Sequence, residues 1–128
     1  MAVAPVVTPN APALAGPYSP AVRAGDWIVL SGQLGLDPAT NVLVEGLEAQ
    51  ARQVLANLGA VIRDCGAAMT DVAKTMLFMT DLAGFPVVNA AYAEAFGEHR
   101  PARSTIQVAA LPMGAVVEIE AWLFCPAQ

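Results

Sequence analysis

The strongest constraint on the fold is a stripe of apolar residues between positions 47 and 65. Its members recur at intervals of three and four residues, which places them on one side of a helix of about five turns. They are Leu47, Ala51, Val54, Leu55, Leu58, Val61, Ile62 and Cys65. Gly66 follows, and glycine commonly ends helices because it adopts the left-handed backbone conformation easily. A helix with one apolar side is stable when that side packs on another element, so this stripe requires a neighbouring sheet or helix.

Runs of β-branched and long apolar residues predict five strands around this helix. The runs span residues 21–23, 27–31, 71–80, 103–110 and 116–124. A hairpin turn at 24–26 joins the first two, and a second helix is expected over 85–96, with Pro86 tolerated in its first turn. The order strand, strand, helix, strand, helix, strand, strand predicts an α+β fold. We expect a single mixed β-sheet with two helices packed on one face.

The chain has the length of one domain, and its beginning differs in composition from the rest. Residues 1–16 are rich in proline and alanine and predict a loose N-terminal lead-in, followed by a single domain over residues 17–128. The longest uncharged stretch, residues 1–22, contains five prolines. Proline breaks helices, so this stretch is not expected to span a membrane.

The chain is more apolar than a small domain can easily conceal. Hydrophobic residues make up 56% and charged residues 13% of the 128 positions. Soluble domains typically contain roughly 45–50% apolar residues on a definition that also counts glycine, and small domains have much surface for their volume. If both helices cover one face of the sheet, the other face is left open. We therefore expect that open face to be buried against another subunit.

Charge and metal-binding residues exclude several classes of function. The formal net charge is −5, and the six lysines and arginines are scattered, which argues against binding nucleic acid through its phosphates. The lone histidine, His99, lies in a charged run typical of a solvated helix end, so no metal site is expected. Cys65 and Cys125 do not form a disulfide framework, and a reducing cytoplasm is the default location.

The last strand carries two glutamates on one face. Side chains alternate along a strand, so one face of residues 116–124 is apolar and suits the core. That face consists of Val117, Ile119, Ala121 and Leu123. Glu118 and Glu120 share the opposite face. They are either solvated at the outside of the sheet or buried in an interface, where each glutamate would need a specific partner.

The preceding strand places Arg103, Thr105 and Gln107 on one face. Arginine can hold a carboxylate through two parallel hydrogen bonds, although a structural ion pair is the alternative. In a simple hairpin between the last two strands, Arg103 would lie about 17 Å along the strand from the residue opposite Glu118. A meeting of Arg103 with Glu118 therefore requires a bulge, a different strand order or a neighbouring subunit.

Three further places could line a binding site, and each has an ordinary structural alternative. Asn89 borders the apolar side of the second helix, where it would act as a structural clamp or contact a ligand. Ser31 and Gly32 end a strand, where their backbone N–H groups could bind an anion or simply form a turn. Tyr18 could equally be an aromatic anchor for the N-terminal segment.

Five blocks, in order from about Gly16 to Phe124, resemble the RidA family, also called the YjgF family. The blocks are Gly16-Pro17-Tyr18-Ser19-Pro20-Ala21, Leu30-Ser31-Gly32-Gln33, Val88-Asn89-Ala90-Ala91-Tyr92, Pro101-Ala102-Arg103-Ser104 and Val117-Glu118-Ile119-Glu120-Ala121. The resemblance covers nearly the whole chain, and it is specific because all five blocks occur together.

The resemblance implies a chorismate mutase-like fold and a homotrimer whose sheets form a central barrel, with clefts at the subunit interfaces. It also implies hydrolysis of 2-imino acids and their enamine tautomers to 2-oxo acids and ammonia, without a cofactor. By motif, Arg103 is the arginine that binds the substrate carboxylate and Glu118 is the acid that positions water. Thr105 occupies a pocket position often held by cysteine, and the remaining cleft residues are Tyr18, Ser31, Gly32 and Asn89.

Two other functions stay open at this point. A protein of the same fold could bind small carboxylates through the same arginine for regulation, without turning them over. RNA cleavage is a further activity that the family brings to mind, although the acidic charge counts against it. Expected partners are therefore the small-molecule imine and two further copies of the chain, with no nucleic acid and no membrane.

Overall fold

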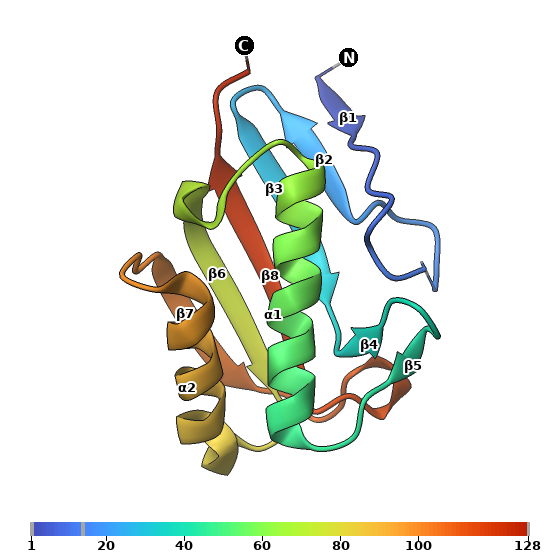
Figure 1. Cartoon of the computed structure of the whole chain (residues 1–128), viewed down its shortest axis with the longest axis vertical. Helices are drawn as coiled ribbons and strands as arrows, with labels where there is room; N and C mark the ends of the chain where they lie inside the picture. The colour runs from blue at the N-terminus through green and yellow to red at the C-terminus, as the bar shows by residue number, and fades with distance from the viewer. Residues whose placement is uncertain (1, 14, 128) are drawn as a thin grey trace.

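Both helices lie on one face of a mixed sheet, as the sequence predicts (Figure 1). The protein is described from a computed structural model, which covers residues 2–13 and 15–127. Within these residues, the helices are α1 (Leu47–Asp64) and α2 (Phe85–Phe96). In spatial order, the six strands of the main sheet are β1 (Val3–Pro5), β2 (Ala21–Ala24), β3 (Trp27–Gln33), β8 (Val117–Phe124), β6 (Val72–Met79) and β7 (Ala102–Gln107).

Helix α1 confirms the amphipathic stripe. Val54, Leu58 and Ile62 are fully buried against the sheet, while the opposite side of the helix is exposed. Gly66 has φ of 74°, the left-handed conformation expected beyond the end of a helix. Burial of the apolar side stabilises α1 far more than its intrinsic helix propensity, since an isolated helix of this length is marginal in water.

The last two strands do not form the simple hairpin considered from the sequence, and the alternative of a different strand order holds. Strand β8 lies between β3 and β6 and is antiparallel to both, whereas β7 pairs in parallel with β6 at the edge of the sheet. The segment β6–α2–β7 is a crossover unit, and such a connection makes its two strands parallel. Burial agrees with this order. One whole side of β8 is buried, as befits a central strand, while β7 is polar and partly exposed.

The expected loose lead-in over residues 1–16 contains an edge strand. Val3 pairs with Ala24 and Pro5 with Val22, so β1 covers the outer edge of β2. Met1 and Leu14 lie outside the described residues. An uncovered strand edge exposes unpaired N–H and C=O groups, and β1 satisfies part of that edge. A small two-stranded sheet, β4 (Leu36–Asp37) with β5 (Val42–Leu43), was also not predicted.

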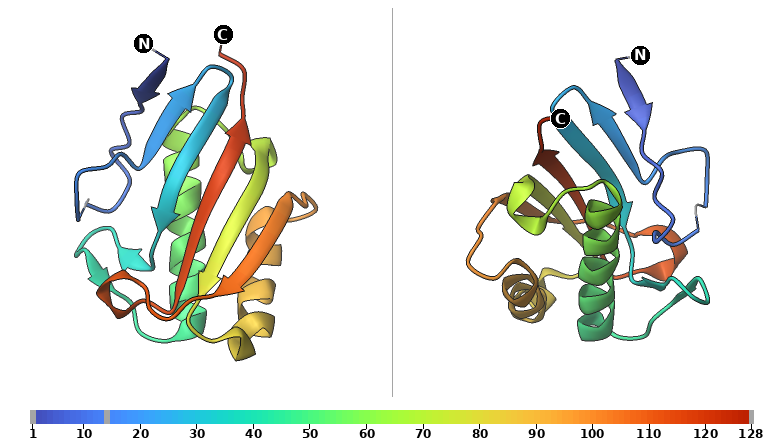
Figure 2. Two further views of the ribbon diagram at one scale, coloured as in Figure 1. Left: turned by 180° about the vertical axis from the view of Figure 1, so that it is seen from behind. Right: turned by 45° about the horizontal axis from the view of Figure 1, so that its top comes forward.

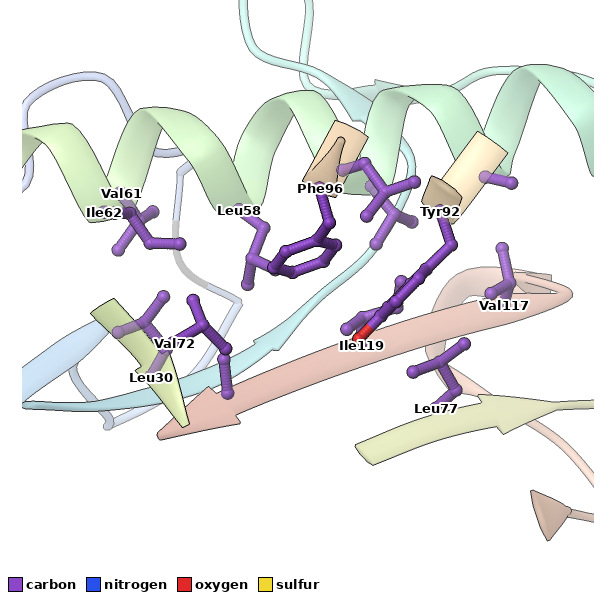
Figure 3. Close-up of a cluster of buried hydrophobic side chains, with 14 of the residues drawn as sticks. Leu30, Leu58, Val61, Ile62, Val72, Leu77, Tyr92, Phe96, Val117 and Ile119 are labelled. Carbon is purple, nitrogen blue, oxygen red and sulfur yellow. The ribbon is translucent and has the colours of Figure 1, made fainter. Parts of the chain in front are cut away.

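The core lies between the helices and the sheet (Figure 3). In β8, alternate side chains are completely buried, as the sequence predicts, and Leu58 and Phe96 reach them from the helices. A buried hydrogen bond of 2.7 Å joins the hydroxyls of Thr75 in β6 and Tyr92 in α2. It fixes α2 over the part of the sheet that carries β7.

The opposite face of the sheet carries no helix (Figure 2, left). Its exposed apolar side chains include Trp27, Phe124 and Ile106, of which Trp27 and Phe124 stack edge to face with ring centroids 5.3 Å apart. Among the described residues, neither helix has the length and apolar character needed to cross a membrane. The excess of apolar residues therefore includes an uncovered patch on this open face.

The Thr75–Tyr92 hydrogen bond generates a stability prediction. Tyr92→Phe should lower the free energy of unfolding by about 1–3 kcal/mol, because it leaves the Thr75 hydroxyl buried without a partner. Adding Thr75→Val removes both hydroxyls and should recover much of that loss. Urea unfolding of the two single variants and the double variant measures the coupling. Additive losses in the double variant would contradict this account.

Candidate functional site

Arg103 is held on the helix-covered side of the sheet, at the edge strand β7. It lies opposite Thr75 in the parallel register, so it points toward α2. Its guanidinium lies over the rings of Phe85 and Tyr92, 5.2 and 4.8 Å from their centroids, and Nη2 donates to Asn89 Oδ1 over 2.6 Å. Stacking and the amide bond restrict the arginine while leaving other N–H donors available to an anion.

Next to Arg103 on β7, Thr105 has a hydroxyl group that lacks a hydrogen-bond partner among the described residues. It shares a face of β7 with Arg103, and its Oγ1 is buried without a hydrogen-bond partner among the described residues. Buried polar groups nearly always have partners, so such an exception calls for an explanation. Gln107, next on the same face, accepts from the backbone N–H of Leu82 over 3.0 Å, and so serves the fold.

Glu118 lies on the open face of the sheet, beside an irregularity in β3. Leu30 pairs with Ala121 and Gln33 with Ile119, so Ser31 and Gly32 together oppose Glu120. This is a β-bulge, a feature that often redirects side chains next to functional sites. A Cβ atom at Gly32 would lie 2.7 Å from Cδ of Glu118, so only glycine leaves room for the carboxyl in its present position.

The environment of Glu118 favours its neutral form. Partial burial raises the pKa of the Glu118 carboxyl above its usual value, and repulsion from the nearby Glu120 raises it further. Burial also raises the pKa of Glu120. Among the described residues, Glu118 has no ion-pair partner and no side-chain hydrogen bond. A carboxyl with a raised pKa is a better proton acceptor near neutral pH than an ordinary one.

Ser31 lies in the β-bulge of β3 that faces β8, and Tyr18 lies near Glu118. The backbone N–H of Ser31 donates to the carbonyl of Pro20, and its hydroxyl donates to the carbonyl of Ser19 over 2.6 Å. The Ser31 N–H is therefore engaged and does not serve as the free anion donor considered from the sequence. These bonds hold residues 18–20 beside β3, and the side chain of Tyr18 remains 50% exposed.

A cavity of about 210 Å³ opens beside Glu118. Its walls are mostly apolar, and they include Tyr18, Gly32, Leu36, Pro112 and Met113. The sequence did not identify Leu36, Pro112 and Met113 as site residues. They lie in a short hairpin and a proline–glycine turn, whose local sequence does not indicate which part of the protein they will contact. A larger groove of about 480 Å³ lies between the two helices, but none of the expected site residues lines it.

The structure divides the expected site residues into two groups on opposite faces of the sheet. Arg103, Asn89 and Thr105 lie on the helix side at β7, whereas Glu118 and Gly32 lie on the open side. Arg103 in β7 pairs with Thr75 of β6, and Glu118 in β8 pairs with Phe78 on the other side of β6. The two residues are therefore offset by three positions along the strand direction. Strand geometry then separates their Cα atoms by about 14 Å. One copy of the chain does not bring them together.

Other possible chemistries find no support in the described part of the chain. His99 is half-buried, and its Nε2 lies 2.8 Å from the carbonyl of Val72, so it fastens the end of α2 instead of lying solvated. Cys65 and Cys125 are free thiols, and burial raises the pKa of Cys65 to about 11. No cluster of three or more histidine, cysteine or acidic side chains suited to a metal ion occurs within residues 2–13 and 15–127.

Comparisons with known proteins identify close relatives. The family model described as endoribonuclease L-PSP matches residues 8–124. The chain is 49% identical over 116 residues to Reactive Intermediate Deaminase A, chloroplastic, of Arabidopsis thaliana, covering 90% of this chain and 62% of that protein. It is 44% identical to the 2-iminobutanoate/2-iminopropanoate deaminase of Salmonella typhimurium, covering 91% and 93%. The crystal structure of the Escherichia coli YjgF gene product superposes with a TM-score of 0.89 at 41% identity, covering 94% and 97%.

The raised pKa of Glu118 generates a prediction on stability against pH. A raised pKa means that folding opposes ionisation of this carboxyl, so the penalty grows as the pH rises from about 4.5 through the folded-state pKa. Glu118→Gln should therefore raise the free energy of unfolding at pH 7, and the gain should vanish at pH 4. Denaturant unfolding at both pH values measures this.

The matched control is Glu45→Gln, which changes an exposed glutamate just before α1 and should give no comparable gain. A loss of stability in Glu118→Gln at pH 7 would show instead that the ionised carboxyl is stabilised by a favourable partner.

Proposed function

The chain belongs to the RidA (YjgF) family, and from this membership we propose that it hydrolyses 2-imino acids to 2-oxo acids and ammonia. The names of its Arabidopsis and Salmonella relatives describe deaminases, the latter of 2-iminobutanoate and 2-iminopropanoate. The residues that the family motifs assign to this chemistry, Arg103 and Glu118, are present in this chain.

The observation that carries the proposal is the division of the site into two complementary halves. One half offers a stacked arginine with free donors, and the other a partly desolvated carboxyl beside an apolar cavity. Because the halves face opposite ways on one protomer, a head-to-tail contact sets the Arg103 half of one copy against the Glu118 half of the next. Contacts of this kind form a closed ring when the rotation between copies closes, and an open filament otherwise. A homotrimer is the ring that the family implies.

Exposed apolar surface supports such an assembly. Trp27, Ile106 and Phe124 on the open face are 43%, 41% and 47% exposed, and Phe85 beside Arg103 is 37% exposed. Burying these side chains between copies removes apolar surface from water, which favours association by roughly 25 cal/mol per Å² before the entropic cost of association is subtracted. The same contact would enclose the proposed cleft and exclude bulk water from it, leaving room for the substrate and the attacking water.

Arg103 binds the substrate carboxylate in this proposal. A guanidinium matches a carboxylate with two parallel N–H···O bonds, which sets the direction of the substrate as well as its affinity. Asn89 and the rings of Phe85 and Tyr92 hold the guanidinium in place beforehand, so little of its side-chain entropy is lost on binding. The buried Thr105 hydroxyl, which lacks a partner among the described residues, lies on the same face and contributes to the same subsite.

Glu118 activates the attacking water. The water oxygen bonds to C2 of the protonated imine while Glu118 accepts one of its protons, giving a tetrahedral carbinolamine. Glu118 then returns that proton to the nitrogen and accepts the hydroxyl proton of the carbinolamine as the C–N bond breaks. The 2-oxo acid forms and ammonia leaves, and ammonia takes the last proton as ammonium, which restores the Glu118 carboxylate. Carbon keeps its oxidation state, so substrate and water balance the reaction without a redox cofactor. The protein acts by orientation and proton transfer.

RNA cleavage, which the family model's description names, is the weaker candidate for this chain. The net charge is −5, and the cavity beside Glu118 is small and mostly apolar. Tight binding to RNA depends on neutralising several phosphates with lysines and arginines. Regulatory binding of carboxylates without turnover uses the same arginine, so kinetics distinguish it from catalysis better than binding does.

Replacement of Arg103 tests the proposed activity. Arg103→Ala should lower kcat/KM for 2-iminopropanoate by about 100-fold or more, because the charge-assisted bonds to the carboxylate are lost. The imine is generated from alanine with an amino-acid oxidase, and ammonia release is followed. Arg100→Ala removes an exposed arginine three positions earlier and should retain activity. Wild-type protein that binds 2-oxobutanoate but does not accelerate imine hydrolysis would favour the regulatory alternative.

Mixing two inactive variants tests whether the site is shared between copies. Arg103→Ala and Glu118→Gln should each be inactive alone. After the two are unfolded together and refolded in equal amounts, random rings contain one intact pairing in four, so about a quarter of wild-type activity should return. Light scattering should give a mass near three times the 13.2 kDa of one chain. A monomer, or a mixture without recovered activity, would exclude the shared site.

A further inference from the structure

Met113 has an unfavourable backbone conformation beside the Glu118 cavity. Its φ is 61° and its ψ is 17°, in the left-handed region that side chains with a Cβ atom rarely adopt. It lies in the turn Pro112–Gly114 that precedes β8, and Gly114 also has a positive φ, of 74°. A glycine at position 113 would relieve this strain, so the methionine does not serve the turn.

Burial does not offset the strain. The Met113 side chain is 53% exposed in the single chain, so it packs little against its own protein. Asn41, the other non-glycine residue with positive φ within the described chain, has φ of 59°, but asparagine adopts this region more readily, and its Oδ1 accepts from the Ala13 N–H over 3.2 Å. Met113 has no comparable local reason, and strain of this kind often occurs at functional sites.

The location of Met113 indicates what it contacts. Together with Leu36 and Pro112, Met113 forms an apolar wall of the cavity that Glu118 also lines. The cavity therefore has a reactive carboxyl and, beside it, apolar surface without a reacting group. At about 210 Å³ it is smaller than the roughly 300–1,000 Å³ of pockets for drug-sized ligands, which suits a small metabolite.

We propose that Met113 determines which 2-imino acids this protein prefers, by covering an apolar substrate side chain longer than methyl. This inference rests on the proposed function and names the substrate class of that site. With C2 of the imine held at Glu118, the substrate side chain enters the apolar part of the cavity and contacts the thioether of Met113. Methionine is flexible and polarizable, so it packs well on side chains of differing shape.

The test compares a long and a short substrate in wild-type protein and in Met113→Gly. Imines are generated from leucine and alanine with an amino-acid oxidase, and the ratio of their kcat/KM values is measured in the full-length assembly. Met113→Gly should lower the ratio of kcat/KM for the leucine-derived imine to that for the alanine-derived imine by about tenfold. Loss of an apolar contact at least as large as one methylene group has an effect of this size. It should unfold at no lower a temperature than wild type, because glycine suits a φ of 61°.

Two further variants separate apolar contact from shape. Met113→Leu keeps an apolar side chain and should keep most of the ratio, whereas Met113→Gln has similar length with a polar end and should lower it. An unchanged ratio in Met113→Gly would overturn the inference. So would an equal loss for both imines together with a smaller mass by light scattering, which would make Met113 an assembly residue. If the wild type hydrolyses neither imine, the proposed function itself fails, and this inference with it.

Discussion

The alternation of side chains along β8 is the constraint on which the rest of the structure depends. Val117, Ile119 and Ala121 enter the core under both helices, and this forces Glu118 and Glu120 onto the open face. A shift of one residue would bury two carboxylates in the core at high cost. The same pattern that stabilises the sheet therefore places a partly desolvated carboxyl on an otherwise apolar surface.

The crossover β6–α2–β7 places the complementary group. Because α2 packs over β6 and β7, the helix-side residues of β7 meet its side chains, and Arg103 is held by Asn89 and two aromatic rings. The Thr75–Tyr92 hydrogen bond fixes the helix that supplies these contacts. An arginine on one face and a glutamate on the other make each protomer an incomplete site, which is the physical reason for proposing a cleft between copies.

Much of the fold could be predicted from local patterns, and the errors share one cause. The stripe of α1, the alternation of β8 and the turn at Gly25 depend on periods of a few residues, so the chain itself displays them. The strand order does not follow from such short periods. A hairpin between β7 and β8 satisfies local rules equally well, but β6 takes the place beside β8 and the partly exposed β7 lies at the edge of the sheet.

The sequence by itself determined the residue types of the site and the side of its own element on which each residue lies, since both follow from local periodicity and from the family motifs. Only the tertiary structure decided which residues became neighbours. It placed Arg103 and Glu118 on opposite faces and the strained Met113 at a cavity. Such neighbours come from strand order, bulges and turns, and these depend on contacts between residues far apart in the chain.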